Sequence, residues 1–230
     1  MSTTTAPAPV APAVPPLTPE AEGESRFLIH SLDWRGYERL LKILGDDGPR
    51  VSYLNGLVEL TSPGPIHEQR SQLLGRMVTL LTTELNIPIR ALGSTTFKRR
   101  NRERGLEPDQ CFYIQGVAML QGRDLAMLDP LPRPDLVIEV EVTSALLDKL
   151  DIYAGLGVPE IWRHDRDGLT VLLLGPDGEY VVAERSLSFP FLPMAGFRQQ
   201  LAAFDPDAET AWNRSFWTWV REVVAPLHQP

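Results

Sequence analysis

The sequence of 230 residues has little of several features that assign a chain to a common class of protein. It holds a single cysteine, Cys111, which excludes an intramolecular disulfide framework and a cysteine-rich zinc module. No apolar run approaches the ~20 residues of a membrane helix, and the N-terminal stretch lacks the basic and apolar regions of a signal peptide. We therefore expect a protein of the reducing cytoplasm that is neither exported nor inserted into a membrane.

Positive charge is also scarce, since 22 Lys and Arg residues stand against 30 Asp and Glu residues, a formal net charge of -8. This balance argues against a large electrostatic footprint for nucleic acid, although it leaves room for a local basic groove. The most basic stretch is a turn that contains Lys98, Arg99, Arg100, Arg102 and Arg104. Two interpretations of this turn stay open, a solvated loop and a phosphate-binding surface.

Several catalytic motifs are missing. The sequence has no glycine-rich phosphate loop, no GxSxG elbow and no HExxH pair, and its four histidines show no metal-ligand spacing. Cys111 stands beside Phe112 and Tyr113, which favours a small buried side chain over a nucleophile.

The first residues, 1–25, are rich in Pro, Ala and Thr and have no amphipathic period. We expect a disordered tail there, because this composition cannot bury enough apolar surface to offset the cost of ordering. A content of 43% hydrophobic residues is enough for one sizeable core. Residues 26–230 are therefore expected to form a single domain.

Periodicity and turn signals predict an α/β fold with a mixed sheet, helices against it, additional β-hairpins and a C-terminal helix. Asn55-Gly56 and the turn 165–168 are hairpin signals. The C-terminal helix should turn Trp212, Phe216, Trp219 and Val223 inward. Helices are expected at 33–45, 66–85, 145–156 and 205–224, the third capped by Thr143 or Ser144, and strands at 50–54, 57–61, 109–114, 135–142, 159–165, 169–175 and 178–186.

The strand predicted at 135–142 is apolar enough to be buried, yet it carries three carboxylates. Side chains two residues apart share a face of a strand, so Asp135, Val137, Glu139 and Glu141 point one way. Burying two carboxylates about 7 Å apart on one face is costly unless a cation, a hydrogen-bond donor or water compensates each of them. A divalent metal ion would do so.

Other candidate residues lie outside this strand. Asp109 stands at the entrance to a strand, where an acid is often only a turn residue. Glu68 lies in the first turn of a helix, where it either complements the helix dipole or belongs to a site. Lys149 and Tyr153 are four residues apart on the predicted helix 145–156 and so share a face.

Three segments carry a resemblance to a known family, namely PDQCFYI from Pro108, PDLVIEVEVTS from Pro134 and DKLDIYAGLGVPEIWRHD from Asp148. They resemble the Uma-type restriction endonucleases, a bacterial family of the PD-(D/E)xK nuclease superfamily. The likeness runs from about residue 32 to about residue 184. It implies a restriction-endonuclease-like fold and metal-dependent hydrolysis of DNA phosphodiester bonds, with Mg²⁺, or Mn²⁺ in its place, as the cofactor.

The resemblance also implies roles for single residues. Asp109 would be the first acid and Glu139 the second, both metal ligands, with Glu68 as an accessory acid. The superfamily places a lysine two residues after the second acid, where this chain has Glu141, and Lys149 from the following helix would take over that function. Glu141 would then be an additional metal ligand or a surface acid.

The charge of the basic turn makes Lys98, Arg99, Arg100 and Arg102 candidates for contacts with nucleic acid. The resemblance further implies that a homodimer could cut both strands of a duplex. Two alternatives remain. A catalytically degenerate nuclease fold acting as an interaction or regulatory module would explain Glu141 and the acidic charge. A small-molecule hydrolase with paired carboxylates would explain the acids but would leave Lys149 and the basic turn unexplained.

Overall fold

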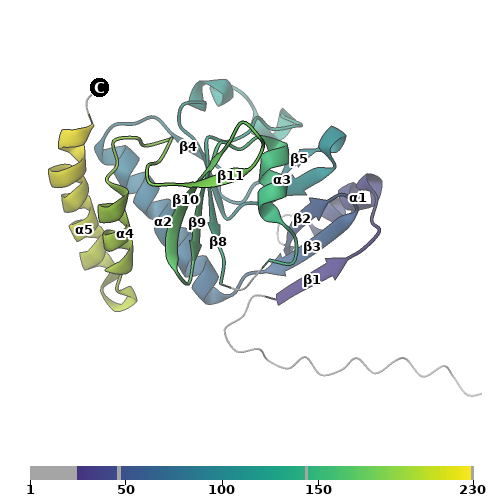
Figure 1. Cartoon of the computed structure of the whole chain (residues 1–230), viewed down its shortest axis with the longest axis horizontal. Coiled ribbons are helices and arrows are strands. Elements are labelled where there is room, and N and C mark those ends of the chain that lie inside the picture. The colour runs from purple at the N-terminus through teal and green to yellow at the C-terminus, as the bar shows by residue number, and fades with distance from the viewer. Residues whose placement is uncertain (1–24, 46–47, 143–144, 229–230) are drawn as a thin grey trace, which may run out of the picture.

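The computed structural model of the protein describes residues 25–45, 48–142 and 145–228 (Figure 1). The tail expected at 1–25 lies outside the described residues except for Ser25, which belongs to the first strand. The described part of the chain forms two β-sheets with helices on their outer faces and one helix between them. None of its helices is long and apolar enough to cross a membrane.

The smaller sheet is antiparallel, and its five strands follow the order β1-β3-β2-β6-β5. Asn55 and Gly56 both adopt positive φ in the tight turn between β2 and β3, which confirms the predicted hairpin. The strands are β1 (Ser25–Ile29), β2 (Arg50–Leu54), β3 (Leu57–Ser62), β5 (Phe97–Arg99) and β6 (Arg104–Leu106).

The larger sheet is mixed and follows the order β11-β10-β9-β8-β7-β4. Its neighbours pair antiparallel except β8 and β9, which are parallel and joined by a crossover through α3 (Lys149–Leu156). The second predicted hairpin connects β9 to β10. The strands are β4 (Arg90–Ala91), β7 (Gln110–Tyr113), β8 (Leu136–Val140), β9 (Glu160–Asp165), β10 (Gly168–Leu174) and β11 (Tyr180–Ala183).

The central strand β8 is buried on both faces. Leu136, Ile138 and Val140 pack with α2 (Pro65–Glu84), α4 (Met194–Ala202) and α5 (Glu209–Trp219). Val137 points the other way, toward α3 and the smaller sheet. This alternation confirms the two faces predicted for the acidic strand, and it places Glu139 on the side of α3.

The smaller sheet has its own apolar face. Trp34 and Tyr37 of α1 (Trp34–Leu44) pack there with Val51, Tyr53 and Val58. Asp33 caps α1 as expected, because its side chain accepts a hydrogen bond from the Gly36 N–H at 2.8 Å. The opposite face of this sheet is turned toward the larger sheet, and it is there that the charged residues described below are found.

Several details differ from the sequence-based expectation, among them the first strand β1, which was not expected, and the start of α5 at Glu209 rather than 205. Helix α3 begins at Lys149 rather than near 145, because Asp148 caps it; the expected caps, Thr143 and Ser144, lie outside the described residues. The proline-containing stretch before the C-terminus contains α4, which begins after Pro193. Val223 is 45% exposed, since the helix continues beyond α5 as a π-turn that buries Val220 and Val224 instead.

Candidate active site

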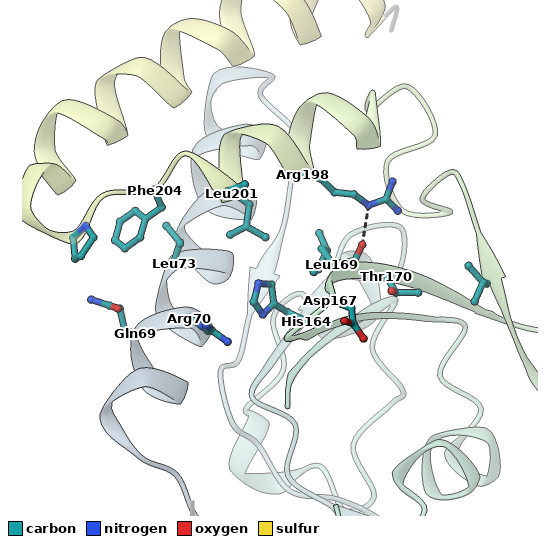
Figure 2. A pocket seen from close by; sticks show the side chains of 14 residues that line it. Gln69, Arg70, Leu73, His164, Asp167, Leu169, Thr170, Arg198, Leu201 and Phe204 are labelled. Carbon is teal, nitrogen blue, oxygen red and sulfur yellow. Dashed lines mark hydrogen bonds between the residues drawn. The ribbon is translucent and has the colours of Figure 1, made fainter. Parts of the chain in front are cut away.

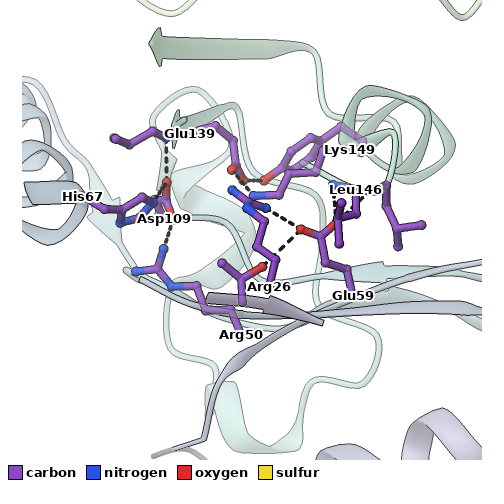
Figure 3. Close-up of polar contacts among 12 residues, drawn as sticks. Arg26, Arg50, Glu59, His67, Asp109, Glu139, Leu146 and Lys149 are labelled. Atoms are coloured by element: carbon purple, nitrogen blue, oxygen red, sulfur yellow. Dashed lines mark hydrogen bonds and ion pairs between the residues drawn. The ribbon is translucent and has the colours of Figure 1, made fainter. Parts of the chain in front are cut away.

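Charged side chains from both sheets meet between them (Figure 3). The smaller sheet contributes its polar face, where Arg50 lies opposite Thr61 and Ser52 opposite Glu59 in the strand register. The larger sheet contributes Asp109, just before β7, and Glu139, on the neighbouring strand β8. Gln110 pairs with Ile138, so Asp109 and Glu139 are the next two residues along and lie opposite each other. The interacting residues are Arg26, Arg50, Glu59, His67, Asp109, Glu139, Lys149 and Tyr153.

Asp109 precedes β7 and is 2% exposed. Its Oδ2 atom accepts a hydrogen bond from the Val140 N–H at 2.6 Å and lies 3.0 Å from His67 Nε2. Its Oδ1 atom forms an ion pair with Arg50, whose other terminal nitrogen, Nη2, donates to Glu68 Oε1 at 2.8 Å. One arginine therefore joins two of the acids that the sequence singled out.

Glu139 lies on the neighbouring strand with both carboxylate oxygens occupied. Lys149 Nζ donates to Oε2 at 2.6 Å, and the Tyr153 hydroxyl donates to Oε1. Burial raises the pKa of Tyr153 well above its usual value, and the charge of Glu139 raises it further, so this phenol stays protonated and acts as a donor. Lys149 and Tyr153 therefore share one face of α3, as expected, and both side chains on that face bind Glu139.

The position of Lys149 conflicts with local helix preferences. It is the first residue of α3, where the helix dipole disfavours a positive charge, and its side chain is only 11% exposed. A buried lysine is rare unless it is paired, and here Glu139 supplies the partner. A departure from local preference is one feature of functional positions, so Lys149 remains a candidate.

Glu59 of β3 is fully buried and holds the segment that leads into α3. Its Oε2 atom accepts hydrogen bonds from the N–H groups of Leu146, at 3.0 Å, and Leu147, at 2.7 Å, while Oε1 pairs with Arg26. Lys149 follows two residues after Leu147. Glu59 therefore fixes the approach of the chain to the lysine, and sequence reasoning did not identify it.

His67 lies in the first turns of α2 and is 3% exposed. Burial lowers its pKa to about 4, and the adjacent Arg50 guanidinium contributes in the same direction. The imidazole is therefore neutral near pH 7, and we infer that its Nε2–H donates to Asp109. The ring orients this carboxylate without adding charge.

Of the other predicted acids, Glu68 and Glu141 adjoin this cluster, whereas Asp135 precedes the first residue of β8 and lies away from it. The Glu68 side chain is 43% exposed and reaches the cluster through Arg50. Glu141 follows the last residue of β8, and its N–H bonds to the His164 carbonyl oxygen at 2.8 Å. Burial raises the pKa of Glu141, with Arg163 acting against that rise. Asp135 accepts the N–H groups of Ile114 and Gly116, which agrees with a role at the entry to the strand.

Two of the four predicted nucleic-acid-binding residues have other contacts. Lys98 pairs with Asp129 at 3.6 Å, and Arg99 donates to the Leu131 carbonyl oxygen at 2.7 Å. Arg100 and Arg102, in a short 3₁₀ turn, are exposed. Only part of the basic turn is therefore presented to solvent.

The chemistry of the acids suits a hard cation, because Asp109 and Glu139 offer oxygen ligands from neighbouring strands on one face of the sheet. Within residues 25–45, 48–142 and 145–228, however, no three His, Cys, Asp or Glu side chains are grouped as a metal site. Arg50 and Lys149 already neutralise the two acids. A metal ion bound to Asp109 would therefore compete with Arg50.

Comparison with known proteins places the chain in a family. A family model described as "Uma2: Putative restriction endonuclease" matches residues 34–202. A solved structure, "a putative nuclease belonging to DUF820 from Anabaena variabilis ATCC 29413", is 18% identical, with a TM-score of 0.48, and the alignment covers 80% of this chain and 97% of that one. No curated protein matches the sequence. The fold is the α/β mixed sheet with flanking helices that the sequence predicts. The chain belongs to the Uma2 family that this family model describes.

Proposed function

We propose that this protein is a metal-dependent endonuclease that hydrolyses the phosphodiester bonds of DNA. The observation that carries the proposal is the 2.6 Å contact between Lys149 Nζ and Glu139 Oε2, in a buried site that also contains Asp109. A lysine, a glutamate and an aspartate from three different segments are thereby gathered at one end of β8. Membership of the Uma2 family supports a nuclease activity.

The residues of the site have separate functions in this proposal. Mg²⁺ or Mn²⁺, held by Asp109 and Glu139, would polarise the scissile phosphate and lower the pKa of a bound water. Lys149 donates a charge-assisted hydrogen bond to the phosphate oxygen that gains charge in the transition state. His67 and the Val140 N–H keep Asp109 oriented, and Glu59 keeps the start of α3 in place. In this proposal Glu68, which contacts Arg50, is an accessory acid, and Glu141 is an additional metal ligand or a surface acid.

Arg50 has a distinct function. It is the counter-ion of Asp109, and it bridges to the half-exposed Glu68. A guanidinium also binds phosphate in a bidentate manner. On displacement from Asp109 by the metal, Arg50 would be free to contact the DNA backbone from the side of the smaller sheet.

A substrate panel tests the proposal. Purified protein is incubated with supercoiled plasmid, linear duplex DNA, single-stranded DNA, RNA and a small phosphodiester, in Mg²⁺, Mn²⁺ or EDTA. We expect nicking of the plasmid with either metal and none in EDTA. Cleavage of RNA alone, or of the small phosphodiester alone, would contradict the assignment to DNA.

A second candidate function is a non-catalytic interaction module on the same fold. The observation in its favour is that Asp109 and Glu139 are neutralised by side chains of the protein itself, while Glu141 stands at the usual lysine position. Calorimetric titration with Mn²⁺ separates the two functions. A nuclease should bind Mn²⁺ and lose this binding in Asp109→Asn, whereas an interaction module of this kind should give no metal-binding heat in either protein.

A further inference from the structure

A cavity of about 770 Å³ lies on the other face of the larger sheet (Figure 2). It is formed by the start of α2, the hairpin between β9 and β10, and the end of α4. This volume falls within the range of small-molecule sites in proteins. None of the residues of the candidate active site lines it.

The cavity nevertheless lies close to the active site. His164, on its wall, is the register partner of Val140, the residue that follows Glu139. Strand geometry puts the Cα atoms of Glu139 and His164 about 6 Å apart, with their side chains on opposite faces of the sheet. The start of α2 borders both places, since His67 contacts Asp109 and Arg70, one turn later, lines the cavity.

The polar wall of the cavity has hydrogen-bonding capacity that the protein does not use. Arg70 is half-buried, and among the described residues it has no hydrogen-bond or ion-pair partner. In Figure 2 its side chain extends toward His164. The buried Nδ1 atom of His164 has no hydrogen-bond partner in another described residue. Burial lowers the pKa of His164, and the charge of Arg70 lowers it further, so the ring is neutral near pH 7.

The wall of the cavity opposite Arg70 is apolar and includes the aromatic ring of Phe204. Leu201 and Phe204, at the end of α4 and just beyond it, face the cavity together with Leu73 of α2 (Figure 2). Phe204 is held edge-on against Trp212, with ring centroids 5.3 Å apart. A ligand that matches both walls combines an anion for Arg70 with a flat, largely apolar ring for Leu201 and Phe204.

We propose that this cavity is a nucleotide subsite, in which Arg70 binds a phosphate and the wall of Leu201 and Phe204 receives the adjoining base. The inference rests on the proposed nuclease function, because a DNA strand with its scissile phosphate at Glu139 would continue around the carboxyl end of β8 and β9 to reach the cavity. The His164 ring lies in the wall beside Arg70 and bounds the space that the nucleotide would occupy. The subsite thereby holds a nucleotide that flanks the cleaved bond.

Binding of a deoxynucleoside 5′-monophosphate, measured by calorimetry in EDTA, tests the subsite without any cleavage. We expect the wild-type protein to bind the mononucleotide, and inorganic phosphate at least about tenfold more weakly, because phosphate makes no contact with the apolar wall. Arg70→Gln should weaken mononucleotide binding about tenfold, the loss expected for one charge-assisted hydrogen bond. The matched control is Arg35→Gln, an exposed arginine on α1 with the same change of charge.

A second variant guards against an effect on folding. Ala202 is exposed at the end of α4 and lines the cavity, so Ala202→Trp should fill the mouth and abolish mononucleotide binding while the melting temperature stays unchanged. Equal affinity of Arg70→Gln and Arg35→Gln, equal affinity for phosphate and mononucleotide, or no binding to the wild type would each overturn the subsite. DNA cleavage without mononucleotide binding would refute only the subsite, and binding without cleavage would refute the nuclease proposal.

Discussion

The buried pair of Lys149 and Glu139 gives a quantitative prediction about stability. Their side chains are 11% and 3% exposed, so removing either partner leaves a charge with little access to water. Each of Lys149→Met and Glu139→Gln should therefore lower the free energy of unfolding by about 3 kcal/mol. The double variant replaces the ion pair with a thioether and an amide, and the amide oxygen still accepts a hydrogen bond from the Tyr153 hydroxyl. Its free energy of unfolding should therefore fall by only about 2 kcal/mol.

The coupling energy follows from these values. Two single losses of about 3 kcal/mol sum to about 6 kcal/mol, and a loss of about 2 kcal/mol in the double variant leaves about 4 kcal/mol of coupling. Urea unfolding at pH 7.5 in EDTA measures all four proteins. For a domain of this size, each single variant should melt roughly 6 to 12 °C below the wild type.

The chain offers a matched control in the pair of Arg221 and Glu84. Its N–O distance is 2.8 Å, close to that of the buried pair, but the Arg221 side chain is 63% exposed. The same cycle, with Arg221→Met and Glu84→Gln, should give a much smaller coupling energy than the buried pair, because water screens the two charges. If the Lys149–Glu139 cycle gave a value as small as this control, the two side chains would not be held together in a dry site and the reasoning would fail.

Three further predictions concern neighbouring residues. Arg50→Gln removes the counter-ion of Asp109, so Mn²⁺ should raise the melting temperature of this variant more than that of the wild type; an equal rise would contradict competition between Arg50 and metal. His67 has a pKa of about 4 in the fold and about 6.5 when unfolded. As the pH falls, the imidazole is therefore protonated in the unfolded state before it is protonated in the folded state, which favours unfolding. Between pH 7 and pH 4 the free energy of unfolding of the wild type should fall by about 3 kcal/mol relative to that of His67→Gln, measured by urea unfolding. Glu59→Gln weakens the hydrogen bonds to the segment before α3, so hydrogen exchange at the Leu147 amide should accelerate and kcat should fall more than KM changes; unchanged exchange would remove the positioning role of Glu59.

The sequence predicts the elements of the fold well where a pattern is local. The hairpin at Asn55-Gly56, the helix α2 and the two faces of β8 are set by turn chemistry and side-chain period, and they are confirmed. The sequence predicts too early a start for α3, because a serine or threonine is a common cap, whereas Asp148 is the cap that forms. It does not predict the helix α4, because prolines before a segment are typical of a loop.

The sequence predicts only some of the residues of the candidate active site, for a physical reason. The strand β3 alternates apolar and polar residues, a pattern typical of a sheet with one face in water. Its polar face is instead covered by the larger sheet, so Glu59 is buried and acts on a segment 87 residues away in the chain. Arg50 and His67 carry no spacing signal either, since their contacts with Asp109 depend on how the two sheets pack.

The groups that offset the negative charges of the buried acids are the main difference from the sequence-based expectation. From the sequence, a cation, a hydrogen-bond donor or water could offset the charges of the acidic strand, and a divalent metal ion is the expected one. In the fold, Lys149 and Tyr153 offset Glu139, and Arg50 offsets Asp109. The metal stays a prediction, and it now has a defined competitor in Arg50.

The most direct test of the account is plasmid nicking in Mn²⁺ by the wild type and by the Lys149→Met, Glu139→Gln double variant. The double variant is expected to be folded, so a difference in cleavage reports chemistry rather than stability. The account predicts nicking by the wild type that EDTA abolishes, and a loss of at least about a hundredfold in the double variant, as for removal of one transition-state donor. Equal nicking by the two proteins would contradict the assignment of the active site.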